Sequence, residues 1–203
     1  MNDLSIYNCV RPLLAPGDVI AFGGTGFVSG AIEFLTHSAV SHVAVVFRQL
    51  DRGLKDRVRI AEATSLNSVS GVQFNYLSER LAEYPGRAWW LPLNPRTRRQ
   101  LDIDTMLDYM DAQDGRPYDF KGIAAFLCRP IPGIGEIPWL HHGAAKAFFC
   151  SEYIVSGFKE GGLPIGIESD EVSPQTLCRL PLYDKQVQLI GKPLEIRPFN
   201  TIG

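Results

Sequence analysis

The sequence has 203 residues, 45% of them hydrophobic, which is enough to bury the core of one globular domain without metals or disulfides. The formal charge of -2 excludes a concentrated basic surface, so we expect no nucleic-acid partner. The one basic cluster, RTRR at residues 96–99, is interpreted as the solvated face of a helix. We therefore treat residues 1–203 as a single domain.

The sequence contains no secretory leader pattern and no apolar run of about 18 residues. We therefore expect a cytoplasmic protein without an integral membrane segment, although peripheral contact with lipid stays open. Four cysteines, at positions 9, 128, 150 and 178, form no CxxC pair. Neither a zinc site nor a dithiol motif is supported, and we expect no metal.

Hydrophobic periodicity predicts an α+β fold in which strands precede most of the helices. The helix expected after the fifth strand rests on Ile103, Met106, Leu107 and Met110, which recur at helical spacing. The expected strands cover residues 19–22, 41–47, 58–64, 71–77 and 88–93, and the expected helices cover 27–35, about 96–113 and 150–160. The sheet core then lies within residues 16–160, and residues 161–203 form edge strands and loops, including 187–190.

A glycine run between the first two strands, FGGTGFVSG, is similar to the fingerprint of short-chain dehydrogenases. Gly23 and Gly26 have the required spacing, but Ser29 occupies the third glycine position. None of the seven tyrosines has a lysine four residues later, as the catalytic pair of that family requires. An NAD(P)-binding protein is therefore an alternative that the successive strands after residue 41 disfavour.

Cys150 is a candidate nucleophile because it opens a predicted helix, where free backbone N–H groups favour a thiolate. A nucleophilic thiol needs a base, and His42 is the best placed because a rigid strand fixes its direction. In the hairpin partner of that strand, Glu62 is the residue that can polarise the imidazole. His37 is interpreted as a helix-end or solvated residue, and the histidines at 141 and 142 as surface residues.

Each of these residues also has a structural interpretation. Cys150 alone could be a packing thiol, and His42 alone could be a strand histidine with its hydrogen bonds satisfied. A non-catalytic binding module is therefore a further alternative, and it is favoured if the three side chains do not converge. Their joint occurrence on a helix start, a strand and the partner strand favours the catalytic interpretation.

At these residues the chain resembles the circularly permuted papain-like cysteine hydrolases, the NlpC-related YiiX/YebB-like branch, of which lecithin:retinol acyltransferase is a cousin. The order histidine, acid, cysteine along the chain is the permuted one. The matching segments are PGDVIAF at 16–22, THSAVSHVAVV at 36–46, IAEAT at 60–64, GRPYDF at 115–120 and FCSEYIV at 149–155.

The resemblance implies an antiparallel sheet or half-barrel packed against helices, with the nucleophile at a helix N-terminus. It implies Cys150 as nucleophile, His42 as general base and then acid, and Glu62 as the residue that orients the imidazole. Tyr118 and Ser151 would support the substrate or the oxyanion. No cofactor is implied. The reaction would be hydrolysis or transfer of an acyl group through a thioester, with a peptide, a cell-wall peptide or an acyl lipid as substrate.

Overall fold

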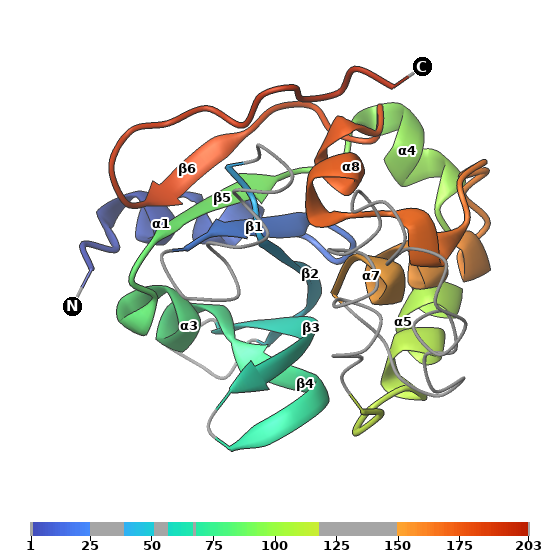
Figure 1. Cartoon of the computed structure of the whole chain (residues 1–203), viewed down its shortest axis with the longest axis horizontal. Helices are drawn as coiled ribbons and strands as arrows, with labels where there is room; N and C mark the ends of the chain where they lie inside the picture. The colour runs from blue at the N-terminus through green and yellow to red at the C-terminus, as the bar shows by residue number, and fades with distance from the viewer. Residues whose placement is uncertain (1, 25–38, 51–56, 67, 118–149, 203) are drawn as a thin grey trace, which may run out of the picture.

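One antiparallel sheet organises the molecule (Figure 1). The computed structural model describes residues 2–24, 39–50, 57–66, 68–117 and 150–202. Within these residues six strands pair in the order β4-β3-β2-β1-β5-β6. Their bounds are β1 (Val19–Gly23), β2 (His42–Leu50), β3 (Arg57–Leu66), β4 (Val69–Tyr76), β5 (Arg87–Leu91) and β6 (Val187–Ile190). The strands predicted from the sequence are thereby confirmed.

Helices cover both faces of this sheet. The helices of the described residues are α1 (Ser5–Val10), α3 (Leu77–Glu83), α4 (Pro95–Gln100), α5 (Ile103–Asp111), α7 (Cys150–Glu160) and α8 (Pro174–Arg179), with single 3-10 turns at Arg11–Leu13 and Ser169–Glu171. Side chains of α5, α7 and α8 form one hydrophobic cluster with the sheet, and those of α1 and α3 form a second. The predicted α+β class is confirmed, with an open antiparallel sheet.

The central strand β1 shows why the sheet holds two hydrophobic layers. All five of its residues are buried. Because successive side chains of a strand point to opposite faces, Val19 and Ala21 belong to the α7 cluster, whereas Ile20 and Phe22 belong to the α3 cluster. Such a strand reads as a continuous apolar run, which is the pattern that predicted it.

The single helix predicted over residues 96–113 is wrong, because two helices share this segment. Leu101 and Asp102 have extended backbone angles between α4 and α5. The Asp102 side chain accepts a hydrogen bond from the Thr105 backbone N–H at 3.1 Å and so begins a new helix. The side-chain cap outweighs the helical spacing of the apolar residues.

Three helices were absent from the predictions, and α3 matters most because it faces β3. It begins directly after β4, at a residue that we assigned to the end of that strand. Leu77 and Leu81 are four residues apart and fully buried, which is the spacing of one helix face. The helix predicted over residues 27–35 lies outside the described residues.

The basic cluster is only partly a solvated face. Arg98 donates to Asp18, a fully buried carboxylate at the start of β1, and to the Pro16 carbonyl. Asp18 also accepts from the Trp90 indole at 2.9 Å. The prediction of a solvated face is therefore wrong for Arg98, which joins α4 to the sheet, while its neighbours Arg96 and Arg99 are exposed as expected.

The helices of the described segments are all short. None of them is long and apolar enough to cross a membrane.

Candidate functional site

His42 and Glu62 meet on one face of the sheet. His42 is the first residue of β2, and Val45 of β2 pairs with Ala61 of the antiparallel strand β3. Strand alternation then puts His42 and Glu62 on the same face. The His42 Nε2 lies 2.6 Å from the Glu62 Oε2. Glu62 is fully buried and the His42 side chain is 12% exposed, so water screens this pair weakly.

Cys150 reaches the same histidine from a different element. It is the first residue of α7, whose buried side chains Tyr153, Ile154 and Phe158 pack in the cluster of the opposite sheet face. The Cys150 side chain lies close enough to His42 that its charge and a hydrogen bond contribute to the raised pKa of the imidazole. Because Nε2 of His42 contacts Glu62, Nδ1 is the ring nitrogen that remains for the thiol. The structure therefore brings the three residues singled out in the sequence into one chain of contacts.

The electrostatic interactions among Cys150, His42 and Glu62 favour the charged forms of His42 and Glu62. Burial by itself lowers the pKa of His42, but the charge and hydrogen bond of Cys150, together with Glu62, outweigh it and raise the pKa to about 9. Burial alone would raise the pKa of Glu62, but His42 and Arg80 outweigh it and lower the pKa to about 2. An imidazolium beside a carboxylate is therefore the stable state near neutral pH.

Sequence reasoning missed two further partners of Glu62. The Asn75 Nδ2 donates to Oε1 at 2.9 Å, while Arg80 donates from Nε to Oε1 at 2.9 Å and from Nη2 to Oε2 at 3.2 Å. Asn75 lies two residues after Gln73, which pairs with Glu62 across β3 and β4, so both point to one face. Arg80 lies on α3, whose leucine spacing was the available signal.

Of the two residues predicted to support the substrate or the oxyanion, the structure describes Ser151 but not Tyr118. Ser151 is fully buried, and its hydroxyl donates to the Val172 carbonyl. This bond connects the first turn of α7 to the residue that follows the 3-10 turn at Ser169–Glu171. This leaves its backbone N–H as the group that could face an oxyanion. Tyr118, His37 and the histidines at 141 and 142 lie outside the described residues.

The glycine run has a packing role at its first part. A Cβ atom on Gly23 would collide with the Ala39 carbonyl and the Trp89 ring, so close packing requires glycine there. Both neighbours of β1 are antiparallel to it, whereas a dinucleotide-binding fold needs a parallel strand at this turn. This pairing disfavours the nucleotide alternative. Gly26 and Ser29 lie outside the described residues.

Within the described residues, neither a metal cluster nor a disulfide involves the buried Cys150 thiol. In the described segments no three histidine, cysteine, aspartate or glutamate side chains are grouped as a metal site requires. Cys9, Cys150 and Cys178 are free thiols, of which Cys9 is exposed and the other two are buried.

Comparison with known proteins identifies one distant relative that spans nearly the whole chain. No family model matches the sequence. The chain is 26% identical to the probable lipoprotein peptidase YaeF of Escherichia coli (strain K12) over 219 aligned residues. The alignment covers 94% of this chain and 74% of YaeF.

The shifted pKa values predict a pH window of greatest stability. The pKa of His42 rises from 6.5 to about 9, so its contribution is complete below pH 6.5 and is lost as the pH rises through 9. The pKa of Glu62 falls from 4.5 to about 2, so its contribution is complete above pH 4.5 and is lost as the pH falls through 2.

We therefore expect the pair to stabilise the fold most between pH 4.5 and 6.5. Urea unfolding from pH 3 to pH 10 measures this for the wild type and for Glu62→Gln. The free-energy difference between the two proteins should be largest inside the window. A difference that does not vary with pH would contradict the assigned charge states.

Proposed function

We propose that the protein is a peptidase-like cysteine hydrolase. The proposal rests on one observation above all, the chain of contacts from Cys150 through His42 to Glu62. A thiol at a helix start, an imidazole within hydrogen-bond reach and a carboxylate on the far ring nitrogen are the parts that nucleophilic acyl transfer requires. The similarity to a probable peptidase supports the same class of reaction.

In the proposed mechanism Cys150 is the nucleophile. Its proton passes to Nδ1 of His42, and Sγ then attacks the acyl carbonyl carbon, forming a C–S bond and an oxyanion. Backbone N–H groups at the start of α7 stabilise that oxyanion. His42 returns the proton to the leaving amine or alcohol as the C–N or C–O bond breaks. Glu62 keeps the imidazole in one orientation throughout.

The second half of the reaction frees the enzyme. The thioester on Cys150 is attacked by water, which His42 activates by taking a proton, and the acid product leaves as the C–S bond breaks. An amine or alcohol acceptor in place of water would make the same site an acyltransferase. The steps use side chains and backbone N–H groups of this chain together with water or another acceptor, and none requires a cofactor.

The substrate class that we favour is a peptide amide, including a cell-wall peptide, because the relative is named a peptidase. Acyl esters and acyl lipids are the alternatives. The order His42, Glu62, Cys150 along the chain also supports a permuted papain-like arrangement of the fold. The cytoplasmic location expected from the sequence stays a prediction.

Selective alkylation tests the proposal without a known substrate. At pH 6 an ordinary thiol is less than about 1% ionised, whereas a thiolate paired with an imidazolium persists. We expect iodoacetamide to alkylate Cys150 at least about tenfold faster than the other three cysteines, as measured by mass spectrometry of the digested protein. Exposed Cys9 is the internal control, and buried Cys178, whose pKa burial raises, should react slowest.

Equal alkylation of all four cysteines would contradict the proposal. Substrate profiling then separates the reaction classes: fluorogenic peptide amides, p-nitrophenyl acyl esters and phospholipid vesicles are each incubated with wild type and Cys150→Ser. Turnover of the amides alone supports a peptidase, and turnover of the vesicles alone supports the acyl-lipid alternative. Cys150-dependent turnover of none of them would favour a binding module.

A further inference from the structure

The Glu62 carboxylate is bound by Arg80 as well as by His42. We propose that Arg80 is a positioning residue that holds Glu62 ionised and thereby sets the tautomer of His42. This inference rests on the proposed function, and it adds a fourth member to the proposed catalytic chain. Arg80 itself touches neither Cys150 nor a reacting atom in this scheme.

The contact between Arg80 and Glu62 has a two-point geometry. Nε and Nη2 of the guanidinium donate to the two different carboxylate oxygens, at 2.9 Å and 3.2 Å. Two parallel hydrogen bonds fix the plane of a carboxylate as well as its charge. Asn75 donates to Oε1 from β4, so the carboxylate accepts from three side chains on three elements.

Aromatic rings hold the guanidinium in place. The Arg80 Cζ lies 5.2 Å from the centre of the Phe22 ring and 5.6 Å from that of Tyr84. The centre of the Phe22 ring is in turn 5.7 Å from that of the His42 ring. One aromatic side chain therefore lies beside both His42 and Arg80, the two charged partners of Glu62. The Arg80 side chain is 12% exposed, which strengthens its attraction to the buried carboxylate.

The protonation state of Glu62 decides which nitrogen of His42 faces the thiol as a base. An ionised carboxylate accepts a hydrogen bond from Nε2–H, which leaves a lone pair on Nδ1 for the Cys150 proton. A protonated Glu62 would instead donate to Nε2, and the neutral imidazole would then carry its proton on Nδ1. Since Glu62 is fully buried, only compensating charge keeps it ionised, and Arg80 supplies a permanent one.

Charges alternate along the completed chain when the site is active. A thiolate on Cys150, an imidazolium on His42, a carboxylate on Glu62 and a guanidinium on Arg80 sum to zero. Each buried charge then has a neighbour of opposite sign, which is the condition under which buried ionised groups persist. Without Arg80 the same three residues would carry a net negative charge inside the protein.

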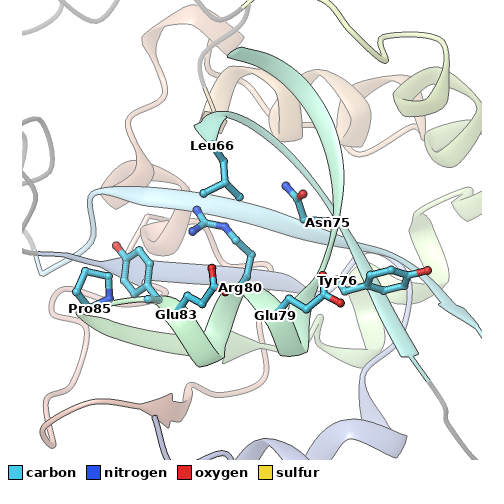
Figure 2. A pocket seen from close by; sticks show the side chains of 8 residues that line it. Leu66, Asn75, Tyr76, Glu79, Arg80, Glu83 and Pro85 are labelled. Atoms are coloured by element: carbon cyan, nitrogen blue, oxygen red, sulfur yellow. The ribbon is translucent and has the colours of Figure 1, made fainter. Parts of the chain in front are cut away.

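Arg80 also lines a pocket. This cavity of about 380 Å³ is lined by Leu66, Asn75, Tyr76, Glu79, Arg80, Glu83, Tyr84 and Pro85 (Figure 2). Figure 2 shows the Arg80 side chain extending from α3 toward the side of the pocket where Leu66 lies. A shortened side chain at position 80 would therefore enlarge an existing cavity instead of opening a closed core.

Arg57 provides a matched control for Arg80. It donates to Glu79, also on α3, and its guanidinium lies 3.4 Å from the centre of the Tyr76 ring. It thus makes an ion pair and an aromatic contact with residues that line the same pocket, and within the described part of the chain it forms no hydrogen bond or ion pair with Glu62. Arg57→Gln removes one positive charge next to the same pocket and leaves the contacts among Cys150, His42, Glu62 and Arg80 unchanged.

The test measures the rate of Cys150 alkylation by iodoacetamide from pH 3 to pH 10 in the wild type, Arg80→Gln, Arg80→Lys and Arg57→Gln. Without the guanidinium the pKa of Glu62 rises from about 2, and an increase of about two pH units would bring the acid limb of the profile to about pH 4 in Arg80→Gln, inside the measured range. Arg80→Lys keeps the positive charge but cannot form the two parallel hydrogen bonds, so its acid limb should shift less than that of Arg80→Gln. Arg57→Gln should follow the wild type.

On whichever substrate is turned over, kcat should fall about 10- to 100-fold in Arg80→Gln with little change in KM. Arg80→Gln in a Glu62→Gln background should cause no further loss, because Arg80 acts through Glu62. Thermal unfolding establishes that each variant is folded. If Arg80→Gln does not fold, the test uses Arg80→Lys and the double variant with Arg80→Gln and Glu62→Gln. The double variant leaves no buried carboxylate without its guanidinium.

An unchanged acid limb in folded Arg80→Gln would overturn the inference, as would equal losses in the presence and absence of the Glu62 carboxylate. If Cys150 stays selectively reactive in these cases, the proposed function stands and only the role of Arg80 fails. If wild-type Cys150 shows no selective reactivity, the proposed function itself fails.

Discussion

Cys150→Ala is expected to abolish acyl hydrolysis, with a loss of at least about 1,000-fold in kcat. The reason is chemical: alanine offers no atom that can form the thioester, and no other described cysteine has a contact with His42. Cys150→Ser retains a hydrogen-bonding group, but its hydroxyl is a far weaker nucleophile beside a base matched to a thiol. Both variants should show the loss in steady-state assays.

The fold should survive this substitution, which separates catalysis from stability. Cys150 is buried at the start of α7, and alanine removes only its sulfur. We expect circular dichroism to be unchanged and the thermal midpoint to move by a few degrees at most. Cys9→Ala, at an exposed thiol on α1, is the matched control and should keep full activity. Substantial turnover by folded Cys150→Ala would remove the cysteine from the mechanism.

The sheet could be predicted because its strands carry a strong local signal. Strands β1 and β2 are buried on both faces and read as apolar runs, and the pairing of β2 with β3 follows from two such runs separated by a short charged stretch of sequence. The division between α4 and α5 could not be predicted with the same ease. One capping contact, from Thr105 to Asp102, outweighed an apolar spacing that continues through the break.

The candidate site was predictable only in part, for a similar reason. Glu62 could be singled out because a carboxylate among buried apolar residues needs a partner. Its contacts with Asn75 and Arg80 depend on the pairing of β3 with β4 and on a short helix with a weak signal of its own. A helix of seven residues is stabilised chiefly by tertiary packing, so sequence alone says little about it.

The contact between Cys150 and His42 depends on tertiary structure even more strongly. The helix α7 packs against one face of the sheet through Tyr153 and Ile154, whereas His42 is bonded to Glu62 on the other face. The thiol meets the imidazole because each residue stands at the end of its element, at the first position of α7 and of β2. Local sequence patterns could identify the two elements, but they could not predict the contact between their first residues.

His42→Gln is expected to reduce hydrolysis by at least about 1,000-fold, and it also changes the pH dependence of the thiol. Glutamine keeps a hydrogen-bonding amide beside Glu62, but it can neither accept the Cys150 proton nor protonate a leaving group. Without the imidazolium the thiolate loses its counter-charge. Alkylation of Cys150 near pH 6 should therefore be slower in His42→Gln than in the wild type.

The wild-type profile supplies the complementary half of this test. Because the pKa of His42 is raised to about 9, its acid form persists through neutral pH, and kcat/KM should fall as the pH rises through about 9. This alkaline limb should be absent from the residual activity of His42→Gln. His37→Gln, at a histidine to which the sequence assigns no catalytic role, is the control and should retain both limbs. An alkaline limb that persists in His42→Gln would assign that titration to another group and leave His42 without its role as general acid.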